Sequence, residues 1–199
     1  MLPKDIDLNF LIDVEVGGNL AVASRLHWPK NDSSGPTISI GIDLGYLNPT
    51  SFNKIFGKIL TTEQYTVLQK GIGIKGALAG QFVKANQSVV LTKQQIMDSF
   101  AIILDDFWNA TKKRYTGIDT MPGCVKTACL SVGYNRGVFN SDEKMKLFDD
   151  AIESKNWKLA ASIVDTMQEG TFWQKRLGPV YRGLNIRRDK ERDLILKAV

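Results

Sequence analysis

The most regular alternation of apolar and polar positions lies in the stretch GPTISIGIDLG, residues 35–45. Apolar residues occupy every second position from Ile38 to Leu44, and small or polar residues lie between them. Strict alternation over this length is typical of a half-buried β-strand. We therefore expect one strand here, with Thr37 and Asp43 on its accessible face.

The chain before this strand has a helical pattern followed by loop residues. Apolar residues at helical spacing predict a first helix over residues 5–16, with Asp5 as its N-cap. Gly17 and Gly18 are expected to end it. Residues 19–36 are polar and contain several Pro, Gly and Ser, which indicates a loop or hairpin.

The chain after the strand is almost entirely helical in pattern. Two capping boxes are expected to start helices, because their side chains and backbone amides can bond reciprocally. Their residues are Thr61 with Gln64 and Thr92 with Gln95. The second box heads a long amphipathic helix that starts near Lys93 and ends in bases. Further helices are expected after Pro122 and over residues 142–154, 157–168, 171–177 and 180–197.

A small β element near the N-terminus followed by a helical body indicates an α+β fold. We find neither an internal repeat nor a linker, so we expect a single domain over residues 1–199. The glycines of LQKGIGIKGALAG have the spacing of a dinucleotide-binding loop, but that loop needs a strand before it and a βαβ unit around it. A helix precedes them here, so we expect a helix–helix connection.

The net charge of +5 favours an anionic partner, which nucleic acid, an acidic membrane surface or the bacterial cell wall would each supply. The chain has no zinc-finger spacing and no aromatic RNA-binding motif, which argues against nucleic acid. No apolar run approaches the roughly 20 residues that span a bilayer, which argues against membrane insertion. One local cluster of bases consists of Arg187, Arg188, Lys190 and Arg192.

Two cysteines and one histidine limit the available chemistry. Cys124 and Cys129 lie in an apolar helical stretch, so we expect buried free thiols and no Cys–His nucleophile pair. A single histidine, His27, excludes the multi-histidine zinc hydrolases. No partner pattern surrounds His27, and we expect it to be structural or exposed.

Glu15 is the first candidate for chemistry. It falls at the end of the first expected helix, where a carboxylate opposes the helix dipole. Either it is a surface residue on a fraying helix, or a functional demand keeps it there. Thr37 and Asp43 can also be explained without a function, because Thr is common in strands and Asp is common at the start of turns. Two carboxylates across a groove would be the arrangement that splits a glycosidic bond.

Four segments of the chain resemble the phage-type lysozymes: IDVEVGG, GPTISIGIDLG, LSVGYNRG and GLNIRRDKER. The chain looks most like the pesticin branch of that superfamily, in which the catalytic order is Glu, Thr, Asp with six residues from Thr to Asp. Glu15, Thr37 and Asp43 have this order and spacing. The likeness runs from about residue 10 to residue 195, nearly the whole chain.

The resemblance implies a lysozyme-like fold and an inverting muramidase that needs no metal or other cofactor. It implies Glu15 as the general acid, and Asp43 with Thr37 as the residues that hold and activate a water. The two carboxyl groups should then lie roughly 6.5 to 9.5 Å apart. It also implies that Arg187 or Arg188 pairs with Glu15, the alternative being a solvated basic face.

Candidate sugar-binding residues are Trp28, Tyr46 and Tyr134, which could stack on sugar rings, and Asn135, which could donate to an acetamido group. For the aromatic residues, a place in the core is the alternative.

The distance between Thr37 and Asp43 requires a bend in the chain. Six residues of straight strand span about 20 Å, which is too far for two side chains to share one water. Gly41 is the expected position of this bend, as a bulge or turn.

The expected partner is the glycan strand of peptidoglycan, and a cognate immunity or inhibitor protein is compatible with the sequence. We expect a monomer that is made in the cytoplasm without a signal peptide and acts on a bacterial cell wall. Two alternatives stay open: a lytic transglycosylase, and a non-catalytic peptidoglycan-binding module on the same fold.

Overall fold

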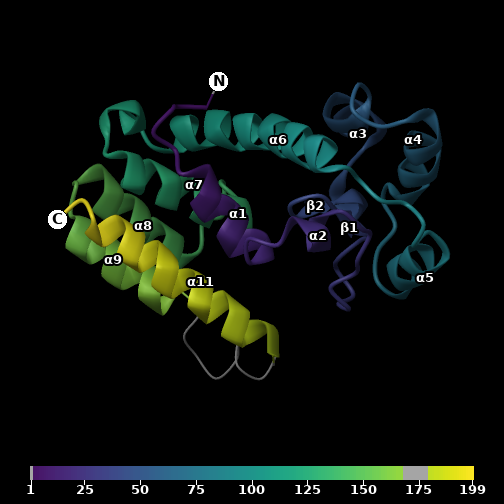
Figure 1. Cartoon of the computed structure of the whole chain (residues 1–199). Helices are drawn as coiled ribbons and strands as arrows, with labels where there is room; N and C mark the ends of the chain where they lie inside the picture. The colour runs from purple at the N-terminus through teal and green to yellow at the C-terminus, as the bar shows by residue number, and fades with distance from the viewer. Residues whose placement is uncertain (1, 168–178) are drawn as a thin grey trace. The chain divides into compact units, whose positions relative to one another are not determined.

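The computed structural model describes residues 2–167 and 179–199. The chain is mostly helical, with one two-stranded antiparallel sheet, and the fold is therefore α+β in the general sense. It divides into two compact units, whose elements are labelled in Figure 1. Unit 1 is Met1–Val14 with Asp105–Val199, and unit 2 is Glu15–Leu104. Among the described residues, we find no helix that combines the length and the apolar character needed to cross a membrane.

Two helices contain the divisions between the units, α1 (Leu8–Val16) and α6 (Lys93–Arg114). The other elements of unit 2 are α2 (Leu20–Ala23), β1 (Thr37–Ile38), β2 (Ile42–Asp43), the 3-10 helix η1 (Leu44–Tyr46), α3 (Pro49–Phe56), α4 (Thr62–Leu68), η2 (Gln69–Gly71) and α5 (Ala77–Ala85). The other elements of unit 1 are η3 (Ile118–Thr120), α7 (Gly123–Arg136), α8 (Glu143–Glu153), α9 (Trp157–Thr166) and α11 (Pro179–Leu196).

Helix α1 is shorter at its start than the sequence suggested. Asp7, not Asp5, caps it, because the Phe10 amide donates to Asp7 Oδ1 at 2.9 Å. Asp5 lies outside the helix and pairs with Lys126 at 2.6 Å. The other end of α1 is as expected, since the chain turns into the left-handed region at the two glycines that follow, with φ of 60° and 71°.

Both capping boxes are confirmed at the predicted positions. The Thr61 amide donates to Gln64 Oε1 at 3.0 Å, and the Gln64 amide donates to Thr61 Oγ1 at 3.3 Å. Thr92 and Gln95 make the same pair of bonds at 2.9 and 3.2 Å. The glycine-rich segment 69–76 connects α4 to α5, so the predicted helix–helix connection is confirmed as well.

The predicted single strand over residues 37–44 is wrong, because this stretch is a tight hairpin. β1 and β2 pair antiparallel, and the three residues from Ser39 to Gly41 make the turn. Gly41 has φ +75° and Ser39 has φ +57°, so the bend expected at Gly41 exists and involves Ser39 too. The apolar residues of the stretch are fully buried as expected: Ile38, Ile40, Ile42 and Leu44.

The polar side of the hairpin is buried at two of its positions, Thr37 and Ser39, whereas Asp43 is half-buried and Gly41 is exposed. The expected accessible face is therefore wrong for Thr37, which is 5% exposed. Ser39 is fully buried, and its amide donates to the Ala23 carbonyl at 2.9 Å. Its hydroxyl lies 2.8 Å from Ser99 Oγ and 3.3 Å from the carbonyl oxygen of Ile96, both on α6. These bonds hold a non-glycine residue in a backbone conformation that few side chains adopt. The hairpin turn is thereby fixed to α2 and α6.

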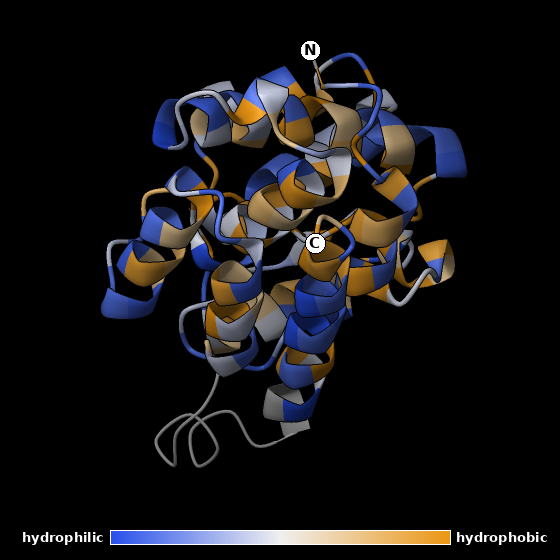
Figure 2. Ribbon diagram, turned by 90° about the vertical axis from the view of Figure 1, so that its left-hand side faces the viewer, coloured by the Kyte–Doolittle hydropathy of each residue, from blue (hydrophilic) through white to orange (hydrophobic). Residues whose placement is uncertain are grey.

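Unit 1 is built from α7, α8, α9 and α11. The helix expected after Pro122 is confirmed as α7, and its residues 125–133 are buried throughout. α11 packs on both α9 and α7, and α9 lies beside α11 in Figure 1. Each of these helices carries both apolar and polar residues, as expected for helices with one buried face and one exposed face (Figure 2). The predicted helix over residues 171–177 lies outside the described residues.

Candidate functional site

Thr37 and Asp43 are direct partners across the β1–β2 hairpin. The Leu44 amide donates to the Pro36 carbonyl at 2.9 Å beside them, which fixes the register. Residues directly opposite in an antiparallel pair present their side chains on the same face, with Cα atoms about 4.5–5.5 Å apart. The structure therefore brings together the hydroxyl and the carboxylate that the sequence placed in one site.

Gly35 bonds to both of these side chains. Its amide donates to both carboxylate oxygens of Asp43, at 3.0 Å each, and its carbonyl accepts from Thr37 Oγ1 at 3.3 Å. A Cβ at position 35 would lie 2.5 Å from Asp43 Oδ1 and 2.5 Å from the amide nitrogen of Gly45. Only glycine leaves room for this arrangement.

Asp43 also has a structural role. It is the N-cap of η1, because its Oδ1 accepts from the Gly45 amide at 2.8 Å. The alternative interpretation of the sequence, in which Asp43 begins a turn, is therefore correct, and Oδ1 is the atom that caps the turn. Oδ2, however, accepts only the shared Gly35 amide among the described residues, at 3.0 Å. The carboxylate is held in place by backbone donors and still has acceptor capacity on Oδ2.

His27 extends the pair to a row of three. Its amide donates to the Thr37 carbonyl at 2.9 Å, and the Thr37 amide donates back to the His27 carbonyl at 2.8 Å. Burial lowers the pKa of the half-buried His27, an effect opposed by a hydrogen bond with the backbone of Arg25 and by the negative charge of Asp43. We call these three residues the His27–Thr37–Asp43 row.

The amino-acid pattern indicates no partner for His27, so sequence reasoning missed this part of the site. The signal that it lacked was the strand pairing, because His27 lies ten residues before Thr37 in a segment without strand periodicity. Gly35 was missed for a similar reason, since a Gly-Pro dipeptide is read as a loop signal and says nothing about a carboxylate eight positions later.

Glu15 is the penultimate residue of α1 and is half-buried. The helix therefore keeps it in a defined place, just before the left-handed turn at Gly17 and Gly18. It belongs to the same compact unit as the His27–Thr37–Asp43 row. The separation of the two carboxyl groups stays a prediction.

Arg187 and Arg188 do not form a solvated basic face, because both are buried in unit 1 on α11. Both pair with the fully buried Glu191, which also accepts from Ser131 Oγ of α7 at 2.5 Å. Burial lowers the pKa of Arg188, while the charge of Glu191 opposes this shift. The two arginines thus belong to a buried charge network, and the pairing of either one with Glu15 stays a prediction.

The rest of the basic cluster is neutralised by acids. Lys190 pairs with Asp13 at 2.5 Å, and Arg192 pairs with three aspartates. This cluster therefore offers no free basic patch, although the sequence singled it out.

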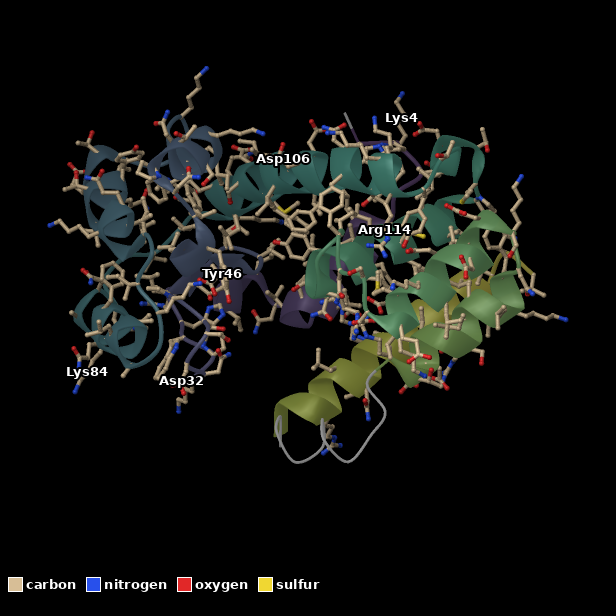
Figure 3. All side chains as sticks on the ribbon, turned by 180° about the vertical axis from the view of Figure 1, so that it is seen from behind. Lys4, Asp32, Tyr46, Lys84, Asp106 and Arg114 are labelled. Atoms are coloured by element: carbon tan, nitrogen blue, oxygen red, sulfur yellow. The ribbon has the colours of Figure 1, made fainter. Side chains whose placement is uncertain are left out.

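The two candidate sugar-binding aromatics of unit 2 have different environments. Trp28 is half-buried and lies across Gly80 of α5, where an added Cβ would approach the indole to 2.6 Å. Tyr46, labelled in Figure 3, is 64% exposed, and Lys75 Nζ lies 3.5 Å from its ring centroid. A well-exposed ring that follows Asp43 by three residues is available to a ligand.

The two candidates of unit 1 are engaged with other side chains. The ring of Tyr134 packs on Phe107, with centroids 4.7 Å apart, so it has the core contact that was the alternative for an aromatic residue. Asn135 is exposed, and its Oδ1 accepts from Arg188 Nη2. Both cysteines are free thiols; Cys129 is buried and Cys124 partly so.

Comparison with known proteins adds no family: no protein-family model matches the chain, and no curated protein matches it.

Proposed function

We propose that the protein is a peptidoglycan hydrolase with a lysozyme-like fold. It cleaves the β-1,4 bond between N-acetylmuramic acid and N-acetylglucosamine. The observation that carries the proposal is the direct pairing of Thr37 with Asp43 across the hairpin. Capping of the turn would by itself explain the presence of Asp43. It would not explain why a residue with a hydroxyl group, Thr37, lies opposite the carboxylate.

In this mechanism, Glu15 protonates the glycosidic oxygen as the bond to the sugar C1 breaks. A water held between Thr37 Oγ1 and Asp43 Oδ2 attacks C1 from the opposite face, and Asp43 takes its proton. The products are a free hydroxyl on one fragment and a reducing muramic acid end of inverted configuration on the other. Hydrolysis of this kind requires two carboxyl groups with room for the water between them.

The hairpin supports the precision that this step needs. Three backbone hydrogen bonds from Gly35 and Gly45 fix the Asp43 carboxylate, and Thr37 is held by its bonds to His27. Ser39 fixes the turn to α6. Groups positioned by the backbone lose little freedom when the water binds, which lowers the entropic part of the barrier.

The test is digestion of purified peptidoglycan, followed by mass analysis of the soluble fragments. Reducing muramic acid ends support the hydrolase, anhydro ends support a lytic transglycosylase, and no fragments support a non-catalytic binding module. The wild type is compared with Glu15→Gln, and Glu63→Gln serves as the matched control because Glu63 is an exposed residue in the first turn of α4. Equal activity of wild type and Glu15→Gln overturns the role of Glu15.

A further inference from the structure

A second feature of unit 2 is a pocket of about 320 Å³ beside α5. Its lining residues come from the segment after His27 and from one face of α5 and its end: Trp28, Lys30, Gly80, Val83, Lys84 and Gln87. The volume is at the lower limit of small-molecule pockets, which suits a monosaccharide or a short peptide.

The aromatic wall of this pocket is held in a fixed position. Gly80 leaves the space that the Trp28 indole fills, and the indole Nε1 donates to the Asn31 carbonyl at 3.3 Å. Gln87 Nε2 donates to the Val83 carbonyl at 2.9 Å and holds the end of α5. The described residues that line the pocket include no member of the His27–Thr37–Asp43 row.

The charge around the pocket is positive. Lys30 and Lys84 are both exposed, and neither forms an ion pair with another described residue. The side chain of Lys84 extends outward from α5 in Figure 3. Among the described residues, those that line the pocket include no acidic side chain. An aromatic wall with two free ammonium groups at its edge is complementary to a ligand that combines an apolar or sugar body with a carboxylate.

We propose that this pocket binds the carboxylate-bearing muramyl-peptide part of peptidoglycan, at a place separate from the bond that is cut. The proposal rests on the proposed function for the choice of ligand. The neutral N-acetylglucosamine units of the same polymer have no group for Lys30 and Lys84, so the pocket distinguishes muramyl peptide from neutral sugar.

The test uses the full chain with Glu15→Gln, so that no cleavage disturbs the binding measurement. N-acetylmuramyl-L-alanyl-D-isoglutamine and neutral chitotetraose are titrated separately, and the shift of the Trp28 indole N–H signal is followed by NMR. Trp28→Phe identifies that signal. Lys30→Ala with Lys84→Ala is compared with Lys58→Ala with Lys70→Ala, because all four lysines are exposed in unit 2.

The expected result is a dissociation constant for the muramyl peptide that rises about three- to tenfold in Lys30→Ala with Lys84→Ala and stays unchanged in the lysine control. Added salt should weaken this binding and leave that of chitotetraose unchanged. Equal binding of the muramyl peptide by both double variants, or no shift of the Trp28 signal, overturns the proposal. If the pocket binds the muramyl peptide but the wild type does not cleave peptidoglycan, the binding proposal stands and the proposed hydrolase function is wrong. If the wild type cleaves peptidoglycan but the pocket does not bind the muramyl peptide, the hydrolase function stands and the binding proposal is wrong.

Discussion

Thr37 and Asp43 are cross-strand partners, and one glycine, Gly35, hydrogen-bonds to the side chains of both. This relationship places a hydroxyl and a carboxylate on one face of a two-stranded hairpin. It also makes the site dependent on backbone geometry at a residue that has no side chain.

Gly35→Ala is expected to displace Asp43. The added Cβ would lie 2.5 Å from Asp43 Oδ1 and from the Gly45 amide, so the hairpin must open. Overpacking of this kind costs about 1–3 kcal/mol of unfolding free energy, measured by urea denaturation. Activity on peptidoglycan should fall with it. Gly183→Ala is the control, because no atom of the described residues lies within 4 Å of the added Cβ. Wild-type stability and activity in Gly35→Ala would contradict the role of this glycine.

Thr37→Val is expected to separate stability from activity. Valine keeps the shape and β propensity of threonine but loses the hydroxyl that donates to the Gly35 carbonyl at 3.3 Å. Loss of this bond costs about 1 kcal/mol of stability. Turnover of peptidoglycan should fall about tenfold to a hundredfold, because the water loses one of its two partners. Thr37→Ser should retain most of the turnover, and a fully active Thr37→Val would show that the hydroxyl holds no water.

Protonation of His27 should make the free energy of unfolding depend on pH. Burial lowers its pKa in the folded state, whereas the unfolded chain has the ordinary value of about 6.5. The unfolded state therefore takes up the proton first as the pH falls, and the free energy of unfolding decreases below about pH 6.5. At higher pH both states are neutral and the effect vanishes. His27→Gln should lose less stability than the wild type between pH 7.5 and 5.5 in urea denaturation; identical losses would rule out this origin.

Substitution of Glu191, which lies far from the hairpin in sequence, should strongly lower the stability of the protein. Its carboxylate is fully buried and pairs with both Arg187 and Arg188, so Glu191→Gln removes the negative charge that these two buried arginines share. Removing one member of a buried ion pair costs about 3–5 kcal/mol, visible as a lower midpoint of thermal unfolding. Glu153→Gln, at an exposed position in α8, should have almost no effect. A small effect in Glu191→Gln would mean that the cluster relaxes or takes up water.

The sequence predicted well those elements whose signal is local. Both capping boxes, the long helix α6 and the glycine stop after α1 depend on residues within one or two turns, and all are confirmed. Asp5 was mistaken for the cap because Asp7 lies two positions later and the pattern fits either residue. Its actual partner, Lys126, is far away in sequence.

The hairpin shows why the candidate site could be predicted only in part. Alternation from Ile38 to Leu44 describes a straight strand and a folded hairpin equally well, and only the distance argument required the bend. The burial of Ser39 depends on Ser99 and Ile96 of α6, which lie about 60 residues later. The same long-range pairing brings His27 beside Thr37. Contacts of this kind have no local signature in one sequence.

The most direct measurement of the central claim is the initial rate of reducing-end release from purified peptidoglycan by Asp43→Asn. The amide keeps the size of the side chain and an oxygen for the Gly35 and Gly45 amides, but it cannot take a proton from water. The account predicts a folded protein with a rate lowered about 10²- to 10⁴-fold, while Asp32→Asn, in an exposed loop of the same unit, keeps the wild-type rate. An Asp43→Asn variant that is folded and cuts at the wild-type rate would contradict the account.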